Sequence, residues 1–171
     1  MGDQIVFKRY GDRTIVSKMP DMSRVKKSVK QQAENNKFRE AALYARTQMA
    51  NPTSKAEYTT RIKGMQRAYN IAIADFYTPP EIKKVDTREF FKSKKLTINA
   101  VDDFKVVKVS VEIYDSNDTL IERGDALELA EFLWEYALTK EYKSEEPYKL
   151  AITAWDKPGN TAVFKTEISN N

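Results

Sequence analysis

The sequence predicts an α+β fold in which a β-hairpin and helices precede an all-β sandwich. Thr78-Pro79-Pro80 interrupts the chain, because a proline pair stops a helix and favours extended backbone in the residue before it. Residues 23–77 show helical periodicity, whereas residues 81–169 mostly alternate as strands do. Net charge changes at the same place, from +8 before the prolines to −4 after them. We therefore expect two domains, a basic hairpin and helical module (residues 1–78) and a sandwich (residues 81–171).

The first expected element is a hairpin. Gln4–Tyr10 and Arg13–Met19 favour strands, and the Gly11-Asp12 pair between them suits a two-residue turn. An isolated hairpin is marginally stable in water, so we expect this one to dock on another surface. Its outward side chains are expected to include some of its cations: Lys8, Arg9, Arg13 and Lys18.

Helices are expected after the break at Pro20. Apolar side chains recur there mostly at steps of three or four, which is one face of a helix. They are Val29, Ala33, Phe38, Ala41, Ala42, Ala45 and Met49. The step from Ala33 to Phe38 is five residues and contains Asn35-Asn36, so a kink or break of the helix at this point is an alternative. Asn51-Pro52-Thr53 ends this helix and offers a cap for the next, and another helix is expected over Met65–Tyr77.

A basic cluster precedes the first helix: Arg24, Lys26, Lys27 and Lys30. Lysine is disfavoured at a helix N-terminus, so helix stability does not explain the cluster. One interpretation is a surface that binds nucleic acid or another anionic partner, extended by Lys8 and Arg9 of the hairpin. The other is a solvated helix start without a binding role.

The strands of the second half are expected to form an antiparallel sandwich. Leu96, Ile98 and Ala100 share one face of their strand, and alternation over residues 104–114 places Val107, Val109, Val111 and Ile113 together. Further strands are expected near residues 119–123, 134–138, 148–155 and 161–168. Residues 126–133 are ambiguous between helix and strand. Trp134 is expected in the core between the sheets. Trp155 lies at a strand end, where the core is favoured and exposure is the alternative.

Three segments of this half carry short motifs: Asn99–Val111, Trp134–Tyr136 and Tyr148–Thr161. They resemble bacterial immunoglobulin-like domains, which carry an Ala-x-Asp segment, a V-x-x-V-x-V strand, an aromatic strand and a closing I-x-A-x-D-x-x-G-N hairpin. The resemblance covers residues 81–169. It implies an immunoglobulin-like sandwich that serves adhesion, spacing, or carbohydrate or protein contact, and it assigns no ligand.

The opening string Gln4–Ser23 is similar to that of small uncharacterised Bacteroidetes proteins. That resemblance implies no known activity. A basic two-part protein of this kind also looks like a component or cargo of phage-like particles, including contractile injection systems.

The composition excludes several chemistries. With neither cysteine nor histidine, the chain has no disulfides, no zinc held by those residues and no Ser-His or Cys-His relay. Carboxylates cluster at Asp102-Asp103 and along Asp115–Asp118. We interpret both as turns, and we predict no enzyme activity and no catalytic, cofactor-binding or metal-binding residues. A calcium site built from Asp102, Asp103 and Asp156 is a weaker alternative.

These observations favour a non-enzymatic structural or interaction protein with a protein partner, as a component or cargo of a contractile injection particle. The N-terminus lacks a basic region followed by an apolar run, so we expect synthesis in the cytoplasm, no membrane span, and any export to occur in a particle without a Sec signal. One alternative is a nucleic-acid-binding accessory protein that uses the basic N-terminal half. Another is a toxic effector of unknown activity. Oligomeric state is left open.

Overall fold

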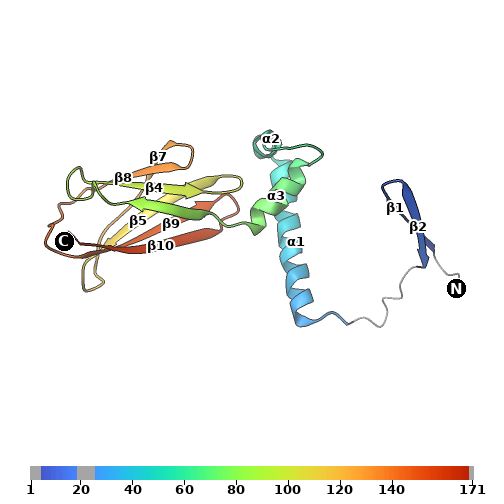
Figure 1. Cartoon of the computed structure of the whole chain (residues 1–171), viewed down its shortest axis with the longest axis horizontal. Helices are drawn as coiled ribbons and strands as arrows, with labels where there is room; N and C mark the ends of the chain where they lie inside the picture. The colour runs from blue at the N-terminus through green and yellow to red at the C-terminus, as the bar shows by residue number, and fades with distance from the viewer. Residues whose placement is uncertain (1–4, 19–25, 170–171) are drawn as a thin grey trace. The chain divides into compact units, whose positions relative to one another are not determined.

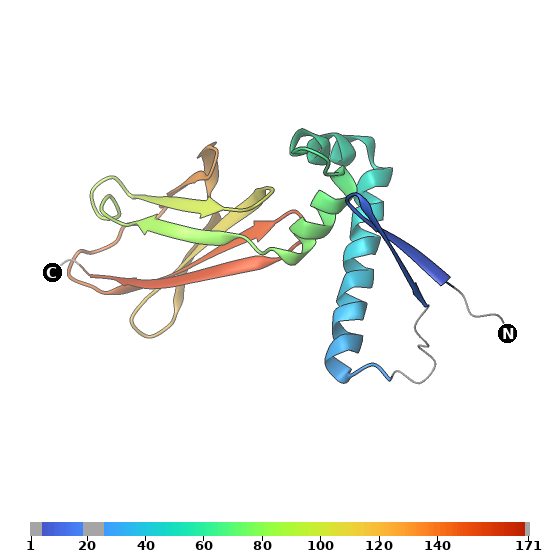
Figure 2. The same ribbon diagram turned by 45° about the vertical axis from the view of Figure 1, so that its right-hand side comes forward.

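The computed structural model describes residues 5–18 and 26–169. It confirms the α+β class: a hairpin, then helices, then two antiparallel sheets. The chain divides into two compact units, Met1–Phe38 and Arg39–Asn171. The predicted domain boundary at the prolines stays a prediction. Figures 1 and 2 show the two sheets of the second unit lying face to face.

The hairpin has the predicted strands and turn. β1 (Ile5–Tyr10) pairs antiparallel with β2 (Arg13–Lys18), with Tyr10 opposite Arg13 across the two-residue turn. Gly11 adopts a φ of 57°, which glycine reaches without steric cost. Most described hairpin side chains are exposed, so the hairpin has no core of its own.

The first helix, α1 (Val29–Ala50), runs without a break through Asn35-Asn36. It begins with a capping box: the Ser28 hydroxyl accepts from the Gln31 amide at 3.2 Å, and the Gln31 side chain accepts from the Ser28 amide at 2.9 Å. This reciprocal pair satisfies backbone donors that a helix start otherwise leaves without partners.

Two short helices follow, α2 (Pro52–Thr60) and α3 (Ala68–Tyr77). Asn51 caps α2 as predicted, accepting from the Ser54 amide at 3.1 Å. The helices share a small core with one residue of the sandwich loops, Phe104. Its members are Ala45, Tyr58, Ala68, Ala72 and Phe104. None of the helices described is long and apolar enough to span a membrane.

The second half folds into two four-stranded sheets. One has the order β3-β4-β8-β7 and the other β10-β9-β5-β6. The strands are β3 (Glu81–Asp86), β4 (Lys95–Val101), β5 (Val106–Tyr114), β6 (Leu120–Asp125), β7 (Leu127–Ala130), β8 (Leu133–Ala137), β9 (Tyr148–Asp156) and β10 (Thr161–Ile168). In the lettering of immunoglobulin domains these orders read A-B-E-D and G-F-C-C′, which makes this an immunoglobulin-like sandwich.

The core lies between the sheets and follows the predicted alternation in most strands. Leu96, Ile98 and Ala100 are buried, and so is Trp134. Val107 is a correction: it is 46% exposed, and Val106 is buried in its place. A shift of register between Val106 and Lys108 causes the exchange, because one extra residue in a strand reverses the alternation on one side of it.

The structure corrects the expected position of Trp155 and resolves the ambiguous residues 126–133. Trp155 lies on the outer face of β9, half-buried, with the Lys108 ammonium 5.5 Å from its ring centroid. It neighbours the buried Ala154 and Asp156, so alternation directs it away from the core. The ambiguous residues 126–133 contain the exposed strand β7 at the edge of its sheet.

Tyr148 at the start of β9 forms a tyrosine corner, a feature of immunoglobulin-like sandwiches. Its hydroxyl accepts from the Lys143 amide at 3.0 Å, five residues upstream. Leu150, two residues on, is buried where antibody domains place the second cysteine. Packing between the sheets therefore replaces a disulfide in this chain.

A buried carboxylate, Glu122 on β6, ties its sheet to the segment after β8. It accepts from the hydroxyls of Tyr136 (2.7 Å) and Tyr142 (2.8 Å) and from the amides of Thr139 (2.8 Å) and Lys140 (3.2 Å). Burial opposes ionisation, but these hydrogen bonds outweigh it and hold the pKa of Glu122 below its ordinary value. All four donors thus find their acceptor in the Glu122 carboxylate, and its role is structural.

We predict that Glu122→Gln lowers the free energy of unfolding by about 2 kcal/mol, because the amide turns an NH₂ group toward donors that need an acceptor. Urea unfolding measures the loss. Glu128→Gln, a matched change at an exposed position of β7, should stay within about 0.5 kcal/mol of the parent. Equal losses in the two variants would contradict the role given to Glu122.

Candidate functional site

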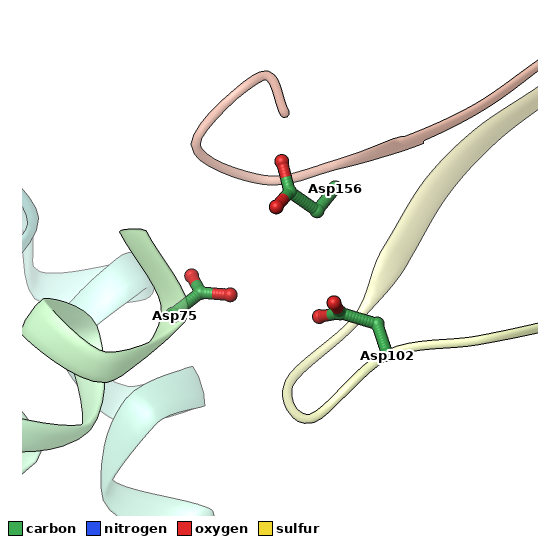
Figure 3. Close-up of side chains that lie close together, drawn as sticks. All are labelled: Asp75, Asp102 and Asp156. Atoms are coloured by element: carbon green, nitrogen blue, oxygen red, sulfur yellow. The ribbon is translucent and has the colours of Figure 1, made fainter. Parts of the chain in front are cut away.

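Three carboxylates converge at one end of the sandwich, where the helices meet it (Figure 3). Asp75 comes from α3, Asp102 follows β4, and Asp156 ends β9. One carboxylate oxygen of each lies within 4.8 Å of the others. Asp75 and Asp156 are each 2% exposed, and Asp102 is partly buried.

Backbone amides hold two of these side chains in place. Asp102 Oδ2 accepts from the amides of Phe104 (2.9 Å) and Lys105 (2.7 Å). Asp156 Oδ1 accepts from the amides of Gly159 (2.8 Å) and Asn160 (2.6 Å). The loop after Asp102 therefore has the turn chemistry that the sequence predicted, and the loop after Asp156 has the same chemistry.

Asn160 links the second loop to the helix. Its side-chain NH₂ donates to Asp156 Oδ2 at 2.7 Å and to the carbonyl of Phe76 at 3.2 Å. Phe76 directly follows Asp75 on α3, so this amide fixes the distance between the helix and the loop after β9.

Asp75 is held by tyrosines. Its Oδ2 accepts a short hydrogen bond from the Tyr58 hydroxyl and a longer one, at 3.5 Å, from that of Tyr44. The two hydroxyls lie 2.7 Å apart. The other oxygen of Asp75 is buried without a hydrogen-bond partner, and so is Oδ1 of Asp102. Two acceptor atoms in this cluster thus remain available.

The electrostatics of the cluster are unfavourable when all three groups are ionised. Two full charges 4.8 Å apart repel by about 3.5 kcal/mol at an effective dielectric constant of about 20. Burial raises the pKa of Asp75 to about 7, opposed by the Tyr58 hydrogen bond and reinforced by the charges of Asp102 and Asp156. Burial also raises the pKa of Asp156. Either protons or a cation must reduce this charge.

The nearby ammonium of Lys157 has other partners. It pairs with the Glu57 carboxylate, lies 3.2 Å from the Ser54 hydroxyl, and sits 5.1 Å from the ring centroid of Tyr58. It reinforces the contact between α2 and the loop after β9. Since Asp75 and Asp156 are almost completely buried, the cluster does not offer an open surface to an organic substrate.

The sequence prediction found part of this cluster. Asp102 and Asp156 come together as the weaker calcium alternative expected, but Asp103 is exposed and lies outside the cluster. Asp75 was missed. The signal that could have found it is an acidic side chain one residue from Phe76 and three from Ala72, on the face of α3 that the periodicity assigns to the core.

The predicted partner-binding residues fall elsewhere. Arg24 lies outside the described residues. Lys26, Lys27 and Lys30 are exposed at the start of α1, and Lys8 and Arg9 are exposed on β1, where neighbouring side chains point to opposite faces. Their role in binding stays a prediction. Asp115 forms the predicted turn, accepting from the amides of Asn117 and Thr119 at 2.8 Å each.

No protein-family model matches the chain, and no curated protein matches it. Among solved structures, it is similar to CopC from Methylosinus trichosporium OB3b, with 18% identity, a TM-score of 0.36, and coverage of 43% of this chain and 72% of that one. An engineered protein shows 20% identity, a TM-score of 0.35, and coverage of 45% of this chain and 16% of its own. These likenesses are too distant to carry a functional argument. The assignment of the sandwich therefore rests on its strand order and its tyrosine corner.

We predict that Asp75→Asn removes a pH-dependent loss of stability. A folded-state pKa of about 7 means that the folded protein binds a proton that the unfolded chain has already released above about pH 4. In a chelating buffer, the contribution of Asp75 to stability is therefore complete below about pH 4 and is lost as pH rises toward 7.

The variant should match the parent near pH 4 and exceed it by about 2–4 kcal/mol at pH 8, as measured by urea unfolding at each pH. Taking the difference between the two proteins cancels the titration of groups that they share. Parallel pH profiles would contradict the electrostatics derived for this cluster.

Proposed function

We propose that the protein is a non-enzymatic interaction protein whose N-terminal hairpin docks on an acidic protein partner, with the immunoglobulin-like sandwich as its scaffold. The observation that carries this proposal is the exposure of apolar side chains on both faces of the hairpin. In water such a hairpin is marginally stable, so a partner surface that covers it contributes to its folding.

The register assigns these side chains to faces. Phe7 pairs with Val16 on one face, and Ile15 pairs with Lys8 on the other. Phe7 is 71% exposed, and Ile15 and Val16 are each at least half exposed. Both faces thus offer apolar anchors of the kind that form the centre of protein interfaces.

The charges around these anchors suit an acidic partner. Lys8 and Arg13 lie on one face, Arg9 lies on the other, and Asp12 in the turn is the one acidic residue of the described hairpin. Cations at the rim of an apolar patch select a partner of opposite charge and accelerate association. The exposed Lys26, Lys27 and Lys30 add further positive charge to the same unit.

Nucleic acid is the second candidate, because the same cations would contact phosphates. Single strands are commonly bound by aromatic side chains that present one stacking surface. Phe7 and Tyr10 are the exposed aromatic residues of the hairpin, but strand alternation places them on opposite faces. This arrangement favours a protein partner.

The narrower parts of the hypothesis stay predictions. They are membership in the bacterial immunoglobulin-like family, the link to Bacteroidetes proteins, the place as component or cargo of a contractile injection particle, and synthesis in the cytoplasm. The sandwich supports the first only at the level of fold, since its topology is common to many families.

We predict that Phe7→p-benzoylphenylalanine in the full chain crosslinks to a protein in the cells that make it. The same label at Val163, which is 59% exposed on β10, serves as the control and should not capture that protein. The crosslinked product should survive nuclease treatment and be identified by mass spectrometry. A product that nuclease removes would favour the nucleic-acid candidate.

Measuring the affinity of hairpin variants for the purified partner then tests whether the hairpin cations contribute to binding. The double variant Lys8→Glu and Arg9→Glu should weaken binding at least about tenfold, with a reduced salt dependence. The control, Lys92→Glu with Lys165→Glu, makes the same change in net charge at exposed positions of the sandwich. Equal effects of the two double variants would contradict docking through the hairpin.

A further inference from the structure

The geometry points to a calcium site: Asp75, Asp102 and Asp156 together bind one Ca²⁺ ion at the end of the sandwich (Figure 3). The convergence of three carboxylates is one observation. The second, independent of it, is the bare Oδ1 of Asp75, a side chain only 2% exposed, which is buried without any hydrogen-bond partner. Buried acceptors are nearly always satisfied, so this atom points to a partner that the other side chains of the protein do not supply.

The donor set selects the kind of ion. All three side chains offer oxygen, and the chain has neither histidine nor cysteine, so softer metals find no preferred ligands here. Ca²⁺ accepts irregular arrangements of six to eight oxygens and takes carboxylates singly or in pairs of atoms. Mg²⁺ demands near-ideal octahedral geometry and keeps several waters, whereas Ca²⁺ tolerates a site in which two of the three carboxylates are almost completely buried.

The site is organised before an ion arrives. Backbone amides engage Oδ2 of Asp102 and leave its Oδ1 bare. The Tyr58 hydroxyl does the same for Asp75, engaging Oδ2 and leaving Oδ1. These hydrogen bonds already fix the two carboxylates in the absence of an ion. Binding of a cation therefore costs little further side-chain entropy.

A bound ion would join parts of the chain that are far apart in sequence. It would hold the end of α3 against the loops that follow β4 and β9, and it would replace mutual repulsion by attraction. In the turn Asp115–Asp118, by contrast, the Asp118 carboxylate already has a cation as its partner, the Lys149 ammonium at 2.7 Å.

The competing explanation is that the carboxylates share protons and bind no metal. The raised pKa of Asp75 fits either case, because a cation and a proton relieve the same repulsion. The two explanations differ in their response to calcium near pH 8. Binding of Ca²⁺ at pH 7 also releases protons, since Asp75 must ionise.

The test uses the full chain, stripped with EDTA and titrated with CaCl₂ or MgCl₂ in a calorimeter. We expect one Ca²⁺ per chain with a dissociation constant of about 10⁻⁶–10⁻⁴ M, weaker binding of Mg²⁺, and a rise in melting temperature of about 5–10 °C at hundredfold excess of Ca²⁺ over that constant. Asp75→Asn and Asp102→Asn should each weaken Ca²⁺ binding at least about tenfold. Asp103→Asn, the exposed neighbour, is the matched control and should bind as the parent does.

Hydrogen exchange on the unmodified chain locates the ion without any variant. Calcium should slow exchange at the amides of Phe104, Lys105, Gly159 and Asn160, and leave the amides of Asn117 and Thr119 unchanged. No heat of binding and no stabilisation up to about 5 mM Ca²⁺ would overturn the site in favour of shared protons. Calcium protection confined to the Asp115–Asp118 turn, or undiminished binding by Asp75→Asn and Asp102→Asn, would overturn it as well.

Discussion

The stacked contact between Phe104 and Tyr58 joins the helices to the sandwich, and the carboxylate cluster depends on it. The ring centroids lie 4.0 Å apart with the planes 17° from parallel, and both side chains are buried. Phe104 lies in the loop that Asp102 shapes, and Tyr58 directs its hydroxyl to Asp75. The apolar contact therefore brings two acids together that would otherwise repel each other.

Arg61 and Lys157 support this junction from its two sides. The Arg61 guanidinium donates to the carbonyl of Phe104 at 3.1 Å, and Lys157 lies 5.7 Å from the Phe104 ring centroid. Each cation also pairs with a carboxylate outside the cluster, Arg61 with Glu131 at 3.6 Å and Lys157 with Glu57.

Alternation in the sequence predicted the strands well because a sandwich buries every second side chain. It failed at Val107, where a single extra residue reverses the pattern. At Trp155 the alternation of β9 was correct and the expectation of a core position was not. It left β7 ambiguous because Leu127–Ala130 forms an exposed edge strand that buries neither face. Edge strands and bulges depend on tertiary context, which periodicity does not contain.

The site was harder to predict than the fold, because its members are brought together only by the junction of helix and sandwich. Asp102 and Asp156 were recognisable as loop acids, whereas Asp75 sits in an apolar helix, where an acid normally costs stability. That cost argues for a ligand. An asparagine at position 75 would accept the same hydrogen bond from Tyr58 without adding charge. Aspartate at this position therefore lowers the stability of the fold unless a cation or a proton occupies the cluster. Tyr44 extends the same reasoning to α1, because its hydroxyl contacts Tyr58 and Asp75. An ion that fixed Asp75 would therefore also restrict the motion of the C-terminal part of α1, which carries Tyr44.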